Sequence, residues 1–180
     1  SRQVLNQICD QYQAQNLTPV VAVELEFYLT DLKRLDSGLL QPPIAPITGL
    51  REVDTQVYAI DNIDDYSALL DDIMLAAQAQ NIPASTAVAE YAPGQFEINL
   101  QHVADPLLAC DQAILLKRII KSLSRKHGFG ATFMAKPYAD QAGSGLHIHM
   151  SLLDASSTNV FACSQQHQPN PMLSKALAGL

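Results

Sequence analysis

The sequence predicts an α+β fold in which helices cover one face of a largely antiparallel sheet. Segments with the two-residue alternation of strands are mixed with segments of helical periodicity, without a regular strand–helix–strand order. Two of the strand segments are joined by a Pro-Gly turn, and most other returns are long. No internal repeat and no linker divides the 180 residues, so one domain with a sizeable core is expected.

The beginning of the chain predicts a helix, a long strand and a loop. Apolar residues recur at helical spacing over 3–15, and Asn16 marks the expected end of that helix. Strand alternation follows over 18–30. Residues 31–62 contain several glycines and prolines and are expected to be irregular. A loop of this length in a compact domain is usually functional or mobile.

The middle of the chain predicts a second helix and a pair of strands. Asp64 or Asp65 can cap a helix that runs to about Gln80, because an apolar stripe follows at helical spacing. Pro83 ends that helix. Residues 85–100 then predict a strand, a turn and a second strand.

A long helix and two further strands are expected after residue 104. Asp105 and Pro106 form a typical helix start, and the helix is expected to run to 127. Its later half carries five basic residues, which fit a solvated face near the helix C-terminus better than a phosphate site. Strands are expected near 130–136 and 145–153, and a short helix ends the chain.

Composition restricts the class of protein. Hydrophobic residues make up 48% of the chain and charged residues 16%, as in globular proteins. The net charge of −7 argues against nucleic acid as a partner. No apolar run reaches the length of a membrane span. Three widely spaced cysteines, Cys9, Cys110 and Cys163, favour a reduced cytoplasmic setting and are expected to be small buried hydrophobes.

The strand over 18–30 carries acidic residues on one face. Alternation places Glu24, Glu26 and Tyr28 together, while the apolar residues between them face a core. Two adjacent carboxylates on one face repel each other, unless a cation or a base lies between them. A second segment, Glu90-Tyr-Ala-Pro-Gly-Gln-Phe-Glu97, adds two carboxylates around the Pro-Gly turn.

Histidines alternate in the last predicted strand. His147, His149 and Ser151 share one face, and Ile148, Met150 and Leu152 are expected to face a core. The glycines just before this strand allow the backbone to approach a ligand closely. Four carboxylates and an imidazole are suitable ligands for Mg²⁺ or Mn²⁺. Each motif alone fits an ordinary amphipathic strand or a hydrogen-bonded core histidine, so only the combination favours a metal site.

Together, the Glu-Leu-Glu-Phe strand, the Glu-Tyr-Ala-Pro-Gly-Gln-Phe-Glu segment and the segment from Lys136 to Ser151 resemble the glutamine synthetase family. Within that family, they are most similar to the γ-glutamylpolyamine (γ-glutamylputrescine) synthetase branch. The resemblance implies a curved antiparallel sheet backed by helices, with the active cavity on the concave face. It also implies that residues 1–180 correspond to the first half of a catalytic domain, with a β-rich domain before it and the second half after it.

The resemblance also implies ligands for two metal ions. Glu26, Glu90 and Glu97 match three ligands of a first ion. Glu24 and His147 match two ligands of a second ion, whose third ligand is expected beyond the chain. The ions would be Mg²⁺ or Mn²⁺, and they would neutralise the charge of ATP during phosphoryl transfer.

Other positions match the substrate contacts of the family. His149 and Ser151 fall where the family contacts the nucleotide, and Gly143 falls where it contacts glutamate. Ala142 replaces an asparagine that is common in bacterial glutamine synthetases, and Ser85 replaces a glutamate that contacts the nucleotide there. No residue is expected to act as a catalytic nucleophile.

The implied activity is an ATP-dependent ligation of glutamate to an amine through γ-glutamyl phosphate. The acceptor would be a polyamine or, as in glutamine synthetase itself, ammonia. A third interpretation is a catalytically inactive relative that serves a structural or binding role, although the complete set of carboxylates argues against it. The complete protein is expected to be a cytoplasmic, ring-forming homo-oligomer.

The first prediction is that this chain has no ligase activity by itself. The arginines with which the family binds glutamate and phosphate are expected beyond Leu180, and removal of one well-placed electrostatic group typically costs about 10²–10³ in rate. The measurement is phosphate release from ATP with Mg²⁺, glutamate and putrescine or ammonia. Turnover by the chain that depends on both glutamate and the amine would contradict this prediction.

Overall fold

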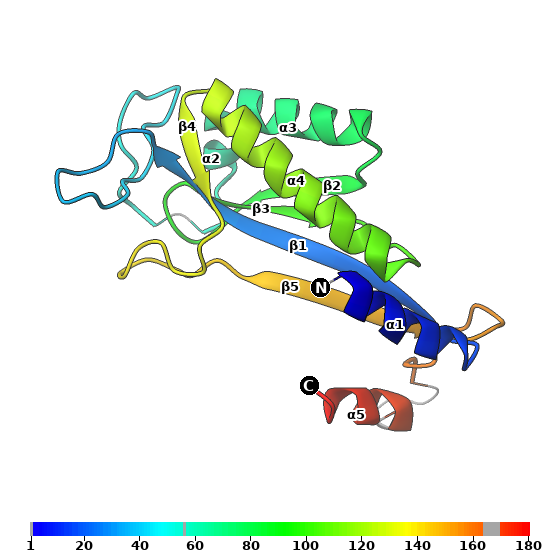
Figure 1. Cartoon of the computed structure of the whole chain (residues 1–180). Helices are drawn as coiled ribbons and strands as arrows, with labels where there is room; N and C mark the ends of the chain where they lie inside the picture. Colours follow the sequence, from blue (N-terminus) through cyan, green and yellow to red (C-terminus); the bar gives the residue numbers. More distant parts are fainter. Residues whose placement is uncertain (1, 56, 164–169) are drawn as a thin grey trace. The chain divides into compact units, whose positions relative to one another are not determined.

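The structure, a computed structural model, describes residues 2–55, 57–163 and 170–180, and it confirms the α+β class (Figure 1). The helices are α1 (Arg2–Gln13), α2 (Ile60–Asp65), α3 (Ser67–Ala79), α4 (Pro106–Lys126) and α5 (Pro171–Leu177). The strands are β1 (Thr18–Asp31), β2 (Ala84–Ala89), β3 (Gln95–Leu100), β4 (Phe129–Thr132) and β5 (Leu146–Leu153). No helix in the described part of the chain is both long and apolar enough to cross a membrane.

The five strands form one sheet in the order β2-β3-β1-β4, and β5 also pairs with β1. The pairs β2–β3, β3–β1 and β1–β4 are antiparallel, as the sequence predicts. β1 is therefore the strand on which the sheet depends. The chain divides into two compact units, whose boundaries fall inside β1, α4 and β5 and after β3. We call Ser1–Ala22, His102–Cys110 and Ile148–Leu180 the first unit, and Val23–Gln101 and Asp111–His147 the second unit.

The core of the second unit forms where α3 and α4 lie on the same side of the strands (Figure 1). Phe27 of β1 and Phe96 of β3 are fully buried, and their ring centroids lie 6.2 Å apart. Ile73 of α3 and Ile120 of α4 are also fully buried. Each such side chain contributes about 1.5–3 kcal/mol by leaving water. The apolar face of β1 is thereby fixed inward, so its acidic face points away from this core.

The predicted cap of the second helix is wrong. α3 begins after Tyr66, which gives it no side-chain cap, and Asp64 and Asp65 belong to the separate short helix α2. Tyr66 is 1% exposed, and its ring packs edge-on against Phe96 and Phe129 at centroid distances of 5.2 and 5.5 Å. Burial of this ring fixes the break between the two helices, which the local sequence signal did not reveal.

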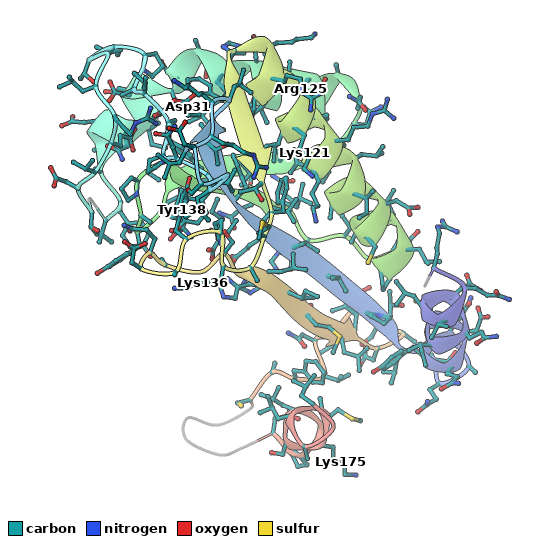
Figure 2. The ribbon with its side chains drawn as sticks, turned by 60° about the vertical axis from the view of Figure 1, so that its left-hand side comes forward. Asp31, Lys121, Arg125, Lys136, Tyr138 and Lys175 are labelled. Carbon is teal, nitrogen blue, oxygen red and sulfur yellow. The ribbon has the colours of Figure 1, made fainter. Side chains whose placement is uncertain are left out.

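The start and end of α4 follow the sequence prediction. A carboxylate oxygen of Asp105 accepts hydrogen bonds from the backbone N–H groups of Leu107 and Leu108 at 3.0 and 3.1 Å. Figure 2 shows Lys121 and Arg125 on the later part of this helix. The Lys121 ammonium lies 5.9 Å from the ring centroid of Phe133. Lys121 therefore lies over an aromatic ring, and the interpretation of the basic residues as a solvated face remains a prediction.

Two expectations for buried residues in the first unit are wrong. Ile148 and Met150 are 64% and 46% exposed, whereas Leu152 on the same face of β5 is buried as predicted. Alternation therefore identified the face but not how far each residue on it is covered. None of the three cysteines is buried as predicted, because Cys9 is only partly buried and Cys110 and Cys163 are exposed.

The long loop between β1 and α2 is irregular, as expected, and is held at several points. Arg51 forms an ion pair with Asp31 at 2.7 Å, and this hydrogen-bonded contact keeps the pKa of Asp31 below its ordinary value (Asp31 is labelled in Figure 2). The neighbouring Glu52 accepts a hydrogen bond of 2.9 Å from the backbone N–H of Gly94. The loop therefore fixes the turn between β2 and β3.

That turn requires glycine for two separate reasons. Gly94 has a φ of +68°, and a Cβ atom there would lie 2.6 Å from Cδ of Pro43. Gly49 has the same φ of +68° but has nothing within 4 Å of its Cβ position. The two glycines therefore share the backbone strain of a substitution but differ in steric clash.

We expect Gly94→Ala to destabilise the chain more than Gly49→Ala. Gly49→Ala should cost about 1–2 kcal/mol of unfolding free energy because of the left-handed backbone. Gly94→Ala should cost about 1–3 kcal/mol more because the methyl group overpacks against Pro43. Urea unfolding of the two variants measures the difference directly. Equal losses would show that the loop moves away from the turn without cost.

Candidate metal site

The pairing of β1 with β3 places carboxylates directly opposite each other. Glu26 is the register partner of Glu97, and Glu24 is the partner of Asn99. Partners in an antiparallel pair share a face, so these side chains all lie on the face opposite the core. The alternation predicted for β1 is thereby confirmed for Glu24 and Glu26 and extends across two strands.

These carboxylates are poorly exposed to water. Glu97 is 9% exposed, and the side chains of Glu24 and Glu26 are 24% and 11% exposed. Burial, followed by the charge of Glu24, raises the pKa of Glu97, although a hydrogen bond from Asn99 opposes this effect. The cluster therefore combines partial burial with mutual repulsion of like charges.

Glu90 belongs to the same electrostatic group. It follows β2, and its backbone N–H donates a 2.8 Å hydrogen bond to the carbonyl oxygen of Gln95. Burial raises the pKa of Glu90, and the charges of Glu97, Glu26 and Glu24 raise it further. The charge of His147 acts in the opposite direction. At neutral pH, ionisation of the group thus carries a free-energy cost that a cation would offset.

His147 brings the imidazole to the carboxylates. Its Nδ1 lies 3.1 Å from Oε2 of Glu24 and 4.0 Å from Oε1 of Glu26. One ligand atom from each of Glu24, Glu97 and His147 lies within 4.8 Å of the others. Divalent cations bind such oxygen and nitrogen atoms at about 2.0–2.6 Å, so a single ion can contact all three. The residues present therefore fit a divalent cation.

The grouping differs in one respect from the two sets that the sequence implies. Glu97, expected at the first ion, is grouped here with Glu24 and His147, expected at the second. A carboxylate has two oxygens and can bridge neighbouring ions. The assignment of Glu26, Glu90 and Glu97 to a separate ion remains a prediction.

The loop before β5 is tied to the acidic face by hydrogen bonds. The hydroxyl of Tyr28 donates to the carbonyl oxygen of Ala142 at 2.7 Å, and Ser144 N–H donates to the carbonyl oxygen of Ala135 at 2.9 Å. Burial, followed by nearby Tyr138 and Glu26, raises the pKa of Tyr28 to about 12, so the hydroxyl keeps its proton at neutral pH. Ala142 therefore holds the loop through its backbone carbonyl. The type of its side chain gives no sign of this role.

Both predicted glycine positions make close contacts. A Cβ atom at Gly145 would lie 2.8 Å from Oε1 of Glu26 and 3.2 Å from the ring of His147. A Cβ atom at Gly143 would lie 2.9 Å from the carbonyl oxygen of Ala135. The missing side chain lets the backbone approach the carboxylate of Glu26 at Gly145 and the backbone of Ala135 at Gly143.

The residues predicted to contact the nucleotide lie in the first unit. The His149 ring packs edge-on against His102 with a centroid distance of 6.2 Å, and Ser151 is half-buried. Alternation within β5 does not indicate His102, because this residue lies outside that strand. Their role in nucleotide binding remains a prediction. Ser85, where the family has a glutamate, is exposed and donates a 3.2 Å hydrogen bond to the carbonyl oxygen of Asn99.

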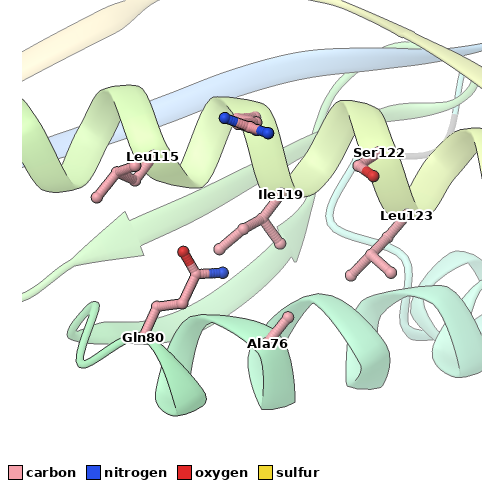
Figure 3. Close-up of a pocket in the computed structure, with 7 residues that line it drawn as sticks. Ala76, Gln80, Leu115, Ile119, Ser122 and Leu123 are labelled. Carbon is pink, nitrogen blue, oxygen red and sulfur yellow. The ribbon is translucent and has the colours of Figure 1, made fainter.

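A cavity of about 320 Å³ lies between α3 and α4, away from the acidic face. Figure 3 shows the residues that line it, among them Gln80, Leu115 and Ile119. None of the predicted site residues lines this cavity. The charged group on β1 and β3 therefore remains the candidate site.

Comparisons with known proteins agree with the motifs. The chain is 50% identical over 179 residues to γ-glutamylputrescine synthetase PuuA of Escherichia coli K12. The aligned region covers 99% of this chain and 38% of that protein. It is 37% identical over 142 residues to a glutamate–isopropylamine ligase of Pseudomonas sp, covering 78% of this chain and 30% of the ligase. The chain thus spans less than two fifths of the length of these relatives.

Solved structures support the same relationship. The structure of a GmaS/ADP complex superposes with a TM-score of 0.84 at 26% identity, covering 99% of this chain and 39% of that chain. The family model described as "Glutamine synthetase, catalytic domain" matches residues 1–180. This chain therefore belongs to the glutamine synthetase catalytic-domain family.

Proposed function

We propose that the complete protein is an ATP-dependent ligase that joins the γ-carboxyl group of glutamate to an amine, and that residues 1–180 are part of its catalytic domain. The observation that carries this proposal is the convergence of Glu24, Glu97 and His147, whose ligand atoms lie within 4.8 Å of one another. In a family of glutamate–amine ligases, such a group is suited to divalent cations that neutralise a bound triphosphate. A catalytically inactive relative would have no need for this buried charge.

The proposed roles of individual residues rest on the family motifs that they match and on the grouping of Glu24, Glu97 and His147. Glu24, Glu26, Glu90, Glu97 and His147 would hold Mg²⁺ or Mn²⁺, because these ions accept carboxylate oxygens and Mn²⁺ also accepts imidazole. The bound ions would offset the charge that develops as the phosphoryl group of ATP is transferred to glutamate. The protein would contribute position and electrostatic stabilisation, and no side-chain nucleophile is required.

Glutamate would lie against the loop that contains Gly143. Its neighbour Ala142 is held by Tyr28, and the carbonyl oxygen of Gly143 itself accepts a 3.0 Å hydrogen bond from Gln95. A fixed backbone can orient the substrate carboxylate for attack on the γ-phosphate of ATP, which would give γ-glutamyl phosphate and ADP. The amine would then displace phosphate and form the amide. His149 and Ser151 would contact the nucleotide.

We propose a polyamine such as putrescine as the acceptor. The similarity to the E. coli γ-glutamylputrescine synthetase, 50%, exceeds the 29% and 32% to the glutamine synthetases of Methanocaldococcus jannaschii and Dictyostelium discoideum. Ammonia is the alternative acceptor, because those relatives match the same region. A cytoplasmic setting and a ring-forming homo-oligomer are further parts of the proposal.

We expect millimolar Mn²⁺ or Mg²⁺ to raise the melting temperature of this chain at pH 7 and low salt. A cation that binds only the folded state at 100 times its Kd adds about 2.7 kcal/mol of stability. The pKa values of Glu90 and Glu97 are raised above the ordinary 4.5, so these carboxylates begin to gain protons at a higher pH than ordinary glutamates do. Because protonated carboxylates bind cations poorly, the metal-induced rise in melting temperature should disappear as the pH falls toward 4.5. Thermal unfolding across this pH range is the measurement.

A matched pair of variants makes the test specific. His147→Ala should lose most of the thermal shift, whereas His127→Ala should keep it, because His127 pairs with Asp72 at 2.7 Å and takes no part in the acidic group. Absence of a shift with either ion in the wild-type chain would refute the metal site.

We expect the complete protein to release phosphate from ATP in a reaction that requires glutamate and an amine. For putrescine, kcat/KM should exceed the value for ammonia by at least about tenfold, which corresponds to about 1.4 kcal/mol. Coupled phosphate assays with each amine measure this ratio. A preference for ammonia would identify a glutamine synthetase, and no turnover with any amine would favour the inactive relative.

A further inference from the structure

Gln95 stands out because both the oxygen and the nitrogen of its buried amide are hydrogen-bonded. It is 2% exposed, at the first position of β3, opposite Tyr28. Its Oε1 accepts from the backbone N–H of Ala92 at 3.2 Å. Its Nε2 donates to Oε2 of Glu26 at 3.1 Å and to the carbonyl oxygen of Gly143 at 3.0 Å. Since Ala92 provides a donor, the amide must present its NH₂ group to Glu26 and Gly143.

These bonds orient the carboxylate of Glu26. Its Oε2 accepts from both Gln95 and the backbone N–H of Gly145, at 3.1 and 2.9 Å. Its Oε1 is the oxygen that faces His147, at 4.0 Å from Nδ1. Two donors on one oxygen fix the plane of the carboxylate and direct the other oxygen toward the histidine. The carboxylate of Glu26 is therefore oriented by the hydrogen bonds from Gln95 and Gly145.

The same amide group also holds the loop before β5. Nε2 donates one hydrogen to Glu26 and the other to Gly143. Because both hydrogens belong to one planar group, movement of either partner would disturb the hydrogen bond to the other. Burial of an amide costs free energy unless all its hydrogen bonds are made, and an apolar residue would fill this position without that requirement. Gln112, another buried glutamine of the second unit, illustrates the contrast, because its Oε1 has no hydrogen-bond partner and its Nε2 reaches Asn81 only at 3.5 Å.

We propose that Gln95 is a positioning residue that couples the cation site to the glutamate-binding loop, an inference that rests on the function proposed above. One hydrogen of Nε2 orients the carboxylate of Glu26 toward the cation, and the other hydrogen of Nε2 holds the backbone at Gly143. Cation binding and glutamate binding should therefore depend on Gln95 together.

The test uses the complete protein with Gln95→Met, which keeps the side-chain volume but removes every hydrogen bond of the amide. Loss of a residue that orients a metal ligand typically weakens metal binding about 10–100-fold. We expect a loss of this size in Mn²⁺ affinity, measured by electron paramagnetic resonance, together with a raised KM for glutamate. The spectrum of the remaining bound Mn²⁺ should also change, which loss of fold stability alone would not produce.

Two further variants keep the proposal falsifiable. Gln95→Glu retains an acceptor for Ala92 N–H and the length of the side chain, so it replaces Gln95→Met if that variant does not fold. It should give the same combined loss. Gln112→Met is the matched control, a buried glutamine in the same unit with no contact to Glu26 or Gly143, and it should leave Mn²⁺ affinity and glutamate KM unchanged.

The outcomes separate this inference from the proposed function. Unchanged Mn²⁺ affinity and glutamate KM in the Gln95 variants, or equal losses in Gln112→Met, would overturn the positioning role. A wild-type protein that binds Mn²⁺ but does not use glutamate would refute the ligase proposal, and the Mn²⁺ affinities would still test Gln95. A wild-type protein that binds no Mn²⁺ would overturn both.

Discussion

Repulsion among carboxylates on one face of β1 and β3 is the constraint on which the rest of the site depends. The register of these strands sets Glu26 opposite Glu97, with Glu24 two residues along the same face. In a solvated surface strand, such like-charged neighbours would turn away from each other into water. Here, partial burial keeps them together, so the folded state contains a concentration of negative charge that a bound cation would offset.

The apolar face of the same strands maintains this arrangement of carboxylates. On one face, Phe27, Phe96 and Ile98 are fully buried beneath the helices, and this burial fixes the register of β1 with β3. Because a slip of one residue would exchange the faces, the core also determines which carboxylates meet. Glu52 and Pro43 of the long loop hold the turn before β3, because Glu52 accepts a hydrogen bond from Gly94 and Pro43 lies beside that glycine. The irregular loop therefore supports the position of Glu97 indirectly.

Much of this architecture could be predicted from local sequence patterns. Alternation over β1 identified its acidic and apolar faces, and Asp105 with Pro106 identified the start of α4, because both signals depend on neighbouring residues alone. The break at Tyr66 could not be predicted, because it follows from packing against Phe96 and Phe129, which are distant in sequence. The exposure of Ile148 and Met150 was missed for a similar reason, since alternation does not reveal what covers a face.

For the site, residue types were easier to predict than their partners. The carboxylates and His147 were identified by pattern and by family resemblance, and the structure brings Glu24, Glu97 and His147 together. The contributions of Tyr28 and Gln95 were not foreseen, because each acts through a hydrogen bond to a backbone carbonyl in a loop more than 45 residues away. The signal was available in part, since Gln95 lies inside the matched segment between Glu90 and Glu97.

The most direct test of the account is to locate the cation. Crystals of the complete protein grown with Mn²⁺ should show an anomalous scattering peak within about 2.0–2.6 Å of ligand atoms of Glu24, Glu97 and His147. An absent peak, or a peak only at other residues while His147 stays hydrogen-bonded to Glu24, would contradict the claim that this cluster is built to bind a divalent cation.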